Sequence, residues 1–273
     1  MGFALLPRFT VRDVERLNIG SAGVPVLLVG PEAPGAHPAA IIQHGYRAAK
    51  EDLLPLAVYL ASYGFVSLLP DAWGHGERLP ERGPSWQSET SPDYFVEVTR
   101  HTVASLREAL GVLAARPEVR ADALVVGGFS MGAIASLIVG TEDARVAGVV
   151  SIAGSPLPDL MGTRLFDSQL PHEAAARWAR GHDAATHIAH LAPRPLLLSH
   201  GRGDDMVPVA GALRLYAAAQ PHYAAHPERL ALLLYDHRHS VTPEQVGDVV
   251  NWIAPLFLSN EDDAADDTAM RAG

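Results

Sequence analysis

Several short stretches of this chain are apolar at consecutive positions, and they constrain the fold more than any other feature of the sequence. A strand exposed on one face alternates apolar and polar residues, whereas a strand covered on both faces is apolar throughout. Strands of the second kind belong to mostly parallel sheets with helices packed on either side. We therefore predict strands at Val24–Val29, Ala39–Gln43, Val66–Leu69, Leu124–Val126, Val146–Ile152, Leu196–Ser199 and Leu230–Tyr235.

Helical patterns lie between these predicted strands. The longest pattern repeats at spacings of three and four, which places its members on one face of a helix: Val96, Thr99, Val103, Leu106, Leu110 and Leu113. Ile134, Leu137 and Ile138 follow the same spacing further along the chain. Since strands and helices alternate, we predict an α/β fold with a mostly parallel central sheet and helices on both faces.

One segment, residues 155–191, interrupts the alternation. It contains prolines, histidines and Trp178, but no pattern typical of a strand. An insertion of this length after a strand forms either a small helical cap over a site or a helical excursion on the surface. We expect a single domain over residues 1–258 with this cap-like insertion. The remaining residues, 259–273, carry five acidic side chains and one arginine, which is typical of a disordered tail.

The composition argues against several classes of function. The 273 residues carry a formal net charge of −10 and Lys50 is the only lysine, so we expect neither nucleic acid nor a membrane as a partner. The chain has no cysteine, which excludes disulfides, thiolate metal sites and a cysteine nucleophile. No signal peptide and no apolar run of roughly 20 residues is visible. We expect a cytoplasmic protein.

A serine flanked by glycines lies where one apolar run ends, in the sequence Gly128-Phe129-Ser130-Met131-Gly132. A strand that turns directly into a helix forces the serine into strained backbone angles, and the glycines allow neighbouring chain segments to approach. The side chain then stands above the strand end, beside the free N–H groups of a helix N-terminus. This context favours a nucleophilic serine over a serine in a plain packing turn.

A serine nucleophile needs a base to take its proton, and the base needs a carboxylate to orient it. Asp204 and Asp205 follow one predicted strand, at the edge of the sheet where sites of parallel α/β folds form. His237 and His239 follow the last predicted strand and precede a helix with strong start signals. Asp236 lies in the same loop as the histidines and is a poorer candidate for the acid.

At these motifs the chain resembles the α/β-hydrolases. The stretches that carry the resemblance are "PDAWGHGER", "GGFSMGA", "HGRGDDMVP" and "RHSVTPE", and the similarity covers about residues 25–258. It looks closest to small bacterial carboxylesterases of the dienelactone-hydrolase and prolyl-oligopeptidase-like branch. Dienelactone hydrolases proper use a cysteine nucleophile, so their own activity is not implied for this cysteine-free chain.

The resemblance implies roles for the candidate residues. Ser130 becomes the nucleophile, the H-G-x-x-D-x-x-V-P pattern selects Asp204 over Asp205 as the acid, and the context before the last helix selects His239 over His237 as the base.

Further residues are implied around this triad. The backbone N–H groups of Met131 and Tyr46 are the implied donors of an oxyanion hole, because they follow the nucleophile and the His-Gly segment. Trp73, and Phe166 and Trp178 of the insertion, are expected to line the substrate pocket.

The expected function is therefore that of a serine carboxylesterase acting on small-molecule esters with short or medium acyl groups, without a cofactor. A thioesterase or a small amidase or peptidase would use the same machinery, and the alternative outside enzymes is an inactive binding protein with a hydrolase fold. His182, His187 and His190 lack the spacing of a ligand motif, so we expect solvated histidines and no metal. The sequence leaves the oligomeric state open.

Overall fold

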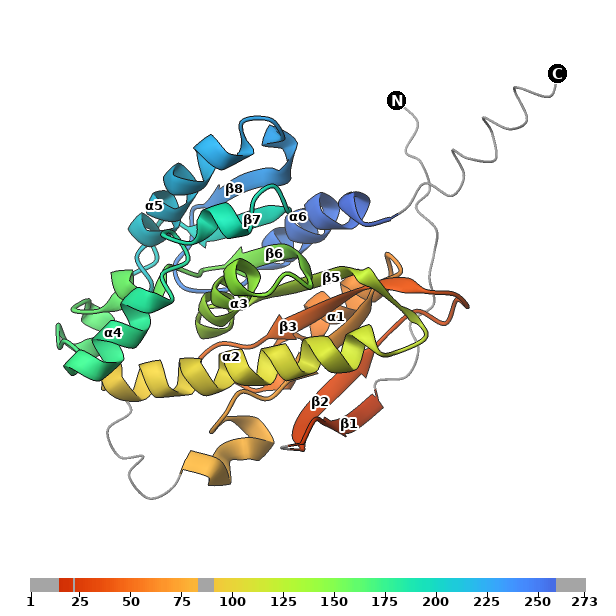
Figure 1. Ribbon diagram of the computed structural model, residues 1–273, viewed down its shortest axis with the longest axis horizontal. Coiled ribbons are helices and arrows are strands. Elements are labelled where there is room, and N and C mark those ends of the chain that lie inside the picture. The colour runs from red at the N-terminus through yellow and green to blue at the C-terminus, as the bar shows by residue number, and fades with distance from the viewer. Residues whose placement is uncertain (1–14, 22, 83–90, 259–273) are drawn as a thin grey trace.

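An eight-stranded sheet forms the centre of the computed structural model, which describes residues 15–21, 23–82 and 91–258 (Figure 1). The strand order is β1-β2-β4-β3-β5-β6-β7-β8. β2 runs antiparallel to both of its neighbours, and all other neighbouring pairs are parallel. The strands are β1 Glu15–Ile19, β2 Val24–Val29, β3 His37–Gln43, β4 Val66–Pro70, β5 Val119–Phe129, β6 Val146–Ile152, β7 Leu196–Gly201 and β8 Leu230–Tyr235. The prediction of a mostly parallel sheet is confirmed, and the acidic segment 259–273 lies outside the described residues.

Every predicted strand is present, and the differences lie at the ends of the sheet and of the strands. β5 begins at Val119, whereas the predicted strand began at Leu124. The first half of β5 contains exposed or half-exposed residues such as Asp122, so it lacks the continuous apolar pattern on which the prediction depended. β1 was not predicted at all. It is an edge strand that pairs only with β2, and its sequence of Glu, Arg, Leu, Asn and Ile mixes polar and apolar residues.

Helices cover both faces of this sheet. They are α1 Leu54–Ala61, α2 Pro92–Ala114, α3 Met131–Glu142, α4 Glu173–Gly181, α5 Val209–Ala219 and α6 Pro243–Ile253. Short 3-10 turns are η1 Lys50–Leu53, η2 Gly76–Arg82, η4 Leu157–Leu160, η5 Arg164–Phe166, η6 Ile188–His190, η7 Gln220–Tyr223, η8 Pro227–Arg229 and η9 Ala254–Leu256. Figure 1 shows α2 and α3 on the near side of the sheet. None of the described helices is both long and apolar enough to cross a membrane.

Two hydrophobic cores explain the consecutive apolar residues. Ile41 packs into the core shared with α2, α3 and α5, whereas its neighbour Ile42 packs into the core shared with α1 and α6. Val126 and Val125 divide between the two cores in the same way. Successive side chains of a strand point to opposite faces, so both must be apolar where both faces are covered. The face predicted from the 3–4 spacing is likewise buried along α2.

Residues 155–191 contain α4, η4, η5 and η6 and, as predicted, no strand. The guanidinium of Arg214 on α5 holds both ends of this insertion. Its Nε lies 2.7 Å from Oδ2 of Asp159 and its Nη2 lies 3.0 Å from Oδ1 of Asp183. Asp183 is mostly buried, which strengthens this ion pair relative to one in free solvent. The insertion therefore has a fixed attachment to α5.

A second attachment joins the insertion to α2. Asp93, in the first turn of α2, accepts a hydrogen bond from the backbone N–H of His172 at 2.9 Å and lies 2.9 Å from the Nδ1 of the same residue. His172 precedes α4, so the first turns of the two helices are held together. Figure 1 accordingly shows α4 beside the N-terminal end of α2.

Candidate active site

Three side chains converge at the edge of the sheet where the parallel strands end. Ser130 follows β5, Asp204 follows β7 and His239 follows β8. Parallel strands place their carboxyl ends at one edge, so these loops meet although they are far apart in the sequence. Oγ of Ser130 lies 3.0 Å from Nε2 of His239, and Nδ1 of that ring lies 2.7 Å from Oδ2 of Asp204.

Ser130 has a strained backbone. Its φ of 55° and ψ of −117° place it in a region that non-glycine residues avoid, at a cost of about 1–3 kcal/mol. Hydrogen bonds hold the strained residue on both sides: its N–H donates to the carbonyl of Ile152 on β6 at 2.9 Å, and its carbonyl accepts from Ile134 at 3.0 Å. The hydroxyl is thereby fixed between the end of β5 and the start of α3.

The glycines around Ser130 are required by the end of β3. A Cβ atom on Gly128 would lie 2.2 Å from the carbonyl oxygen of Gln43, and one on Gly132 would lie 2.0 Å from the same oxygen. Because the clashing oxygen belongs to the backbone, no side-chain movement could relieve these contacts. Any residue larger than glycine would therefore push β3 away from the serine turn. A Cβ on Gly45 would make a milder contact, 3.0 Å from the ring of Phe129, which would have to move by a few tenths of an ångström. Glycine at these positions lets the loop after β3 approach Ser130.

Two hydrogen bonds define the tautomer of His239. The carboxylate of Asp204 can only accept, so Nδ1 carries the proton and Nε2 offers its lone pair to the hydroxyl of Ser130. The imidazole ring also packs on Phe129, with centroids 4.7 Å apart, and its side chain is 17% exposed. In this state the ring can take a proton from the serine.

The loop that carries His239 is anchored to the strand that leads to Asp204. The hydroxyl of Thr242 accepts from the backbone N–H of Gln245 at 3.2 Å, in the capping box at the start of α6. The buried side-chain amide of Gln245 donates in turn to the hydroxyl of Ser199 on β7 at 2.9 Å. These bonds fix the position of the imidazole relative to β7.

Asp204 has a fully buried side chain that is held ionised by its hydrogen bonds. Burial alone would raise the pKa of this carboxyl, but hydrogen bonds from His200, His239 and the backbone N–H of Val207 outweigh burial and hold the pKa well below its usual range. Oδ1 accepts from the N–H groups of Met206 and Val207 at 3.0 and 2.9 Å. The carboxylate is therefore fixed in both charge and orientation.

The competing residues point elsewhere. The carboxylate of Asp205 is exposed and pairs with the guanidinium of Arg238, which lowers the pKa of Asp205. Nδ1 of His237 lies 2.7 Å from the backbone carbonyl of Arg238 and donates to it. The side chain of Asp236 is 93% exposed and lies 3.5 Å from Arg202. None of these three side chains takes part in the hydrogen bonds that join Ser130, His239 and Asp204.

A cavity of about 280 Å³ opens beside Ser130. Its lining comes from the loop after β3, the start of α2, the serine turn, the insertion and the loops after β7 and β8: Gly45, Tyr46, Arg47, Ala48, Phe95, Phe129, Ser130, Leu165, Phe166, Met206, Val207 and His239. Most of these side chains are apolar or aromatic, as in sites that bind small organic molecules.

Of the three aromatic residues expected in the pocket, the structure brings only Phe166 to this cavity. The ring of Trp73 instead stacks on His101 with centroids 4.7 Å apart, and the ring of Trp178 stacks on His182 at 4.1 Å. Both tryptophans are partly buried and pack against the core. Their positions in the sequence, near a strand end and in the insertion, therefore did not predict which residues line the pocket.

The two residues expected to supply oxyanion donors lie next to the serine in the chain or line its cavity. Met131 is the first residue of α3, where a backbone N–H has no acceptor within the helix. Tyr46 lies in the loop after β3 and lines the same cavity as Ser130.

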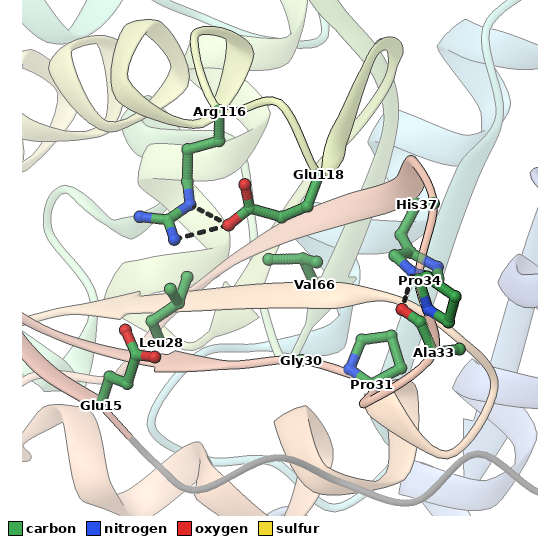
Figure 2. Close-up of a pocket in the computed structure, with 11 residues that line it drawn as sticks. Glu15, Leu28, Gly30, Pro31, Ala33, Pro34, His37, Val66, Arg116 and Glu118 are labelled. Atoms are coloured by element: carbon green, nitrogen blue, oxygen red, sulfur yellow. Dashed lines mark hydrogen bonds and ion pairs between the residues drawn. The ribbon is translucent and has the colours of Figure 1, made fainter.

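Another cavity lies at the opposite end of the sheet, near the beginning of β3 and β4 (Figure 2). It holds only about 90 Å³, and its side chains are engaged locally: Arg116 pairs with Glu118, and His37 donates to the carbonyl of Ala33 at 2.9 Å. Within the described part of the chain no three His, Asp or Glu side chains gather as a metal site requires.

Among the contributors to the site that sequence reasoning missed are His200 and Phe95. His200 was read only as part of a motif, but its Nε2 lies 3.4 Å from Oδ2 of Asp204 and 2.8 Å from the carbonyl of Val207. Phe95 lines the cavity from the first turn of α2. In the sequence, this phenylalanine cannot be told apart from an ordinary core residue of the helix. The H-G-x-x-D spacing was the one signal that could have indicated His200.

Comparison with known proteins identifies the family of the chain. The family model described as the dienelactone hydrolase family matches residues 24–215. Esterase YjfP of Escherichia coli (strain K12) is 28% identical over 247 residues, which cover 85% of this chain and 94% of that protein. The crystal structure of TT1662 from Thermus thermophilus has a TM-score of 0.76 at 29% identity, covering 92% of this chain and 100% of that one.

A more distant solved structure shares the fold. Acetyl xylan esterase 1 from Thermoanaerobacterium sp. JW/SL YS485 has a TM-score of 0.64 at 21% identity, and the match covers 92% of this chain and 86% of that one. The matched family region includes the ends of both β5 and β7, where Ser130 and Asp204 lie. The chain has the α/β-hydrolase fold, belongs to the dienelactone hydrolase family and is an esterase-like hydrolase.

Proposed function

We propose that this protein is a serine hydrolase of carboxylic esters in which Ser130 is the nucleophile, His239 the general base and Asp204 the orienting acid. The observation that carries the proposal is the continuous line of hydrogen bonds, 3.0 Å from Ser130 to His239 and 2.7 Å from His239 to Asp204. Triads of this kind are recognised by geometry and tautomer rather than by position in the sequence.

The reaction follows from this geometry in two halves. Oγ of Ser130 attacks the ester carbonyl carbon while Nε2 of His239 takes the hydroxyl proton. The tetrahedral intermediate collapses, the bond to the alcohol oxygen breaks, and the imidazolium returns the proton to that oxygen. Water then attacks the acyl carbon while Nε2 of His239 takes one of its protons. The bond from that carbon to Oγ breaks, the imidazolium returns the proton to Oγ, and the carboxylic acid leaves. The ionised Asp204 stabilises the imidazolium in both halves.

The negative oxygen of each tetrahedral intermediate needs donors. The backbone N–H groups of Met131 and Tyr46 are the proposed pair, one at the start of α3 and one on the loop that Gly45 brings against the serine turn. The loss of one such donor lowers kcat by about 10²–10³-fold in serine hydrolases.

The cavity supports a preference for short acyl groups. Its volume of about 280 Å³ lies just below the range of roughly 300–1,000 Å³ that is typical of pockets for drug-sized ligands. Leu165 and Phe166 of the insertion close it together with Phe95 of α2. We therefore assign the insertion the role of a cap that forms a wall of the pocket within a single hydrolase domain.

The proposal is tested by p-nitrophenyl esters of increasing acyl length, with a thioester and an anilide of the best acyl group for comparison. We expect turnover of the esters, with kcat/KM highest for the short acyl chains. Ser130→Ala should reduce kcat by at least about 10⁴-fold, because the nucleophile is lost. Ser240→Ala, which removes an exposed hydroxyl from the His239 loop, is the control. Wild type no faster than Ser130→Ala on every ester would refute the proposed function.

A further inference from the structure

The loop that carries Tyr46 is held at both ends by the segment that follows β4. The loop runs from the end of β3 at Gln43 to η1, which begins at Lys50. The first residue of the loop, His44, contacts Ala72, and Lys50 at its far end contacts Asp71.

His44 fixes the peptide plane between Gly45 and Tyr46. Its Nε2 accepts from the backbone N–H of Ala72 at 3.0 Å, so Nδ1 carries the proton and donates to the carbonyl of Gly45 at 2.8 Å. Burial lowers the pKa of His44, which keeps the ring in this neutral tautomer. The carbonyl of Gly45 and the N–H of Tyr46 belong to one planar unit and point in opposite directions. Fixing the carbonyl therefore fixes the direction of the N–H.

Lys50 fixes the other end of the loop. The carboxylate of Asp71 binds this residue twice, accepting the backbone N–H at Oδ1 at 3.0 Å and the ammonium at Oδ2 at 2.7 Å. The only lysine of the chain is 2% exposed, and the Asp71 side chain is fully buried. Glu77 adds a second contact to the ammonium at 2.5 Å. Hydrogen bonds to Asp71 and Glu77 outweigh burial and raise the pKa of Lys50, so the cation persists.

Gly76 makes this arrangement possible. Its φ is 51°, and a Cβ atom there would lie 2.1 Å from Oδ1 of Asp71. The backbone N–H of Glu77 donates to Oδ2 of the same carboxylate at 3.0 Å. The turn after β4 thus wraps around Asp71 and presents its carboxylate to the neighbouring loop.

Between these two anchors the loop is strained. Arg47, directly after Tyr46, has a φ of 62° in the left-handed region. The ring of Tyr46 packs on the rings of His75 and Phe95, with ring centroids 5.1 and 5.5 Å apart. Strained residues persist only where their surroundings over-determine them. Buried ion pairs contribute little net stability to a fold. The main effect of the Lys50–Asp71 pair is therefore to place this loop.

We propose that Asp71, acting through Lys50, and His44 are positioning residues that hold the Tyr46 N–H in the oxyanion hole. The inference rests on the proposed function, because it concerns a donor for the same reaction. None of the three side chains touches the reacting atoms; each acts through the backbone of the loop.

The test compares Lys50→Met with the double variant Lys50→Met/Asp71→Asn, which buries no unpaired carboxylate and so preserves folding if the single variant does not. We expect kcat on the best p-nitrophenyl ester to fall about 10²-fold with KM within about threefold, as for the loss of an oxyanion donor. Affinity for phenylboronic acid, whose tetrahedral serine adduct places an oxygen in the oxyanion hole, should fall by a similar factor.

Arg194→Met is the matched control for loss of a partly buried cation. Arg194 lies at the opposite end of β6 from Ser130, and its guanidinium donates to the backbone carbonyls of Gly140, Asp143, Val146, His190 and Leu191. This variant should lower the melting temperature but keep kcat, with assays run well below that temperature. If the Lys50 variants keep kcat and boronate affinity, or lose them only as Arg194→Met does, the positioning role is wrong.

The same data separate this inference from the proposed function. A wild type without Ser130-dependent ester turnover counts against the proposed function itself. An active wild type with unimpaired Lys50 variants counts only against the positioning role.

Discussion

His239→Ala is expected to lower kcat for ester hydrolysis by a factor on the order of 10⁶, the scale seen when the histidine of a serine triad is removed. The imidazole is the proposed base, and its Nε2 lies 3.0 Å from Oγ of Ser130, so without it the proton would have no acceptor during attack. Initial rates with a p-nitrophenyl ester, together with circular dichroism to verify folding, provide the measurement.

The neighbouring histidine is the control for this result. His237 donates to the carbonyl of Arg238 and makes no contact with Ser130 in the structure, so His237→Ala should retain most of the activity. A large loss in His237→Ala with activity preserved in His239→Ala would reverse the two assignments.

Asp204→Asn should lower kcat by about 10⁴-fold, less than the loss of the serine or the histidine. The amide has nearly the shape of the carboxylate, but it no longer favours the tautomer with the proton on Nδ1 and cannot stabilise the imidazolium. Asp205→Asn removes an exposed carboxylate that pairs with Arg238, and it should leave kcat close to that of the wild type. Comparable losses in both variants would show that the aspartate assignment is wrong.

The lowered pKa of Asp204 also predicts a pH dependence. A carboxyl whose pKa is lower in the folded than in the unfolded protein adds stability above about pH 4, the unfolded value, and this stability is lost as the pH falls through the folded value. Asp204 therefore stays ionised between about pH 5 and 8 and contributes no inflection to kcat/KM there. The wild type should have a higher free energy of unfolding at neutral pH than at acidic pH, and Asp204→Asn should make this difference smaller. Urea unfolding of both proteins at the two pH values would measure it.

The sequence predicted those parts of the fold that depend on burial. Strands such as β3 and β5 are covered on both faces, so their residues must be apolar at every position and the pattern is visible in one sequence. β1 escaped prediction because an edge strand with one neighbour has no such requirement. The first half of β5 was missed for a related reason, since its exposed residues carry no apolar signal.

The backbone of the site was predictable for steric reasons. Gly128 and Gly132 are needed wherever a strand turns into a helix this close to a neighbouring carbonyl, so the glycines identified the turn at Ser130. The choices between Asp204 and Asp205 and between His237 and His239 were different, because adjacent loop residues point in directions that no local pattern reveals. They relied on resemblance, and the roles of the chosen pair stay predictions until the variants are measured.

Contacts between distant segments lay beyond the sequence. Trp73 was expected at the pocket from its position in the chain, yet it stacks on His101, so its place depends on how α2 packs against the segment after β4. Trp178, also expected there, stacks on His182 within the insertion itself, and the place of that pair depends on how the insertion packs. The double attachment of Lys50 to Asp71 joins residues 21 positions apart, and neither residue type indicates a partner by itself. Only the register of β3 against β4 brings the two together.

The most direct test of the account is stoichiometric inactivation by a fluorophosphonate, with the modified residue located by peptide mass mapping. A serine activated by His239 should take up one phosphonyl group per chain, on Ser130, and esterase activity should fall in proportion to that modification. The His239→Ala variant should react far more slowly under the same conditions. Activity that persists after complete modification of Ser130, or inactivation with the label on another residue, would contradict the assignment of Ser130 as the nucleophile.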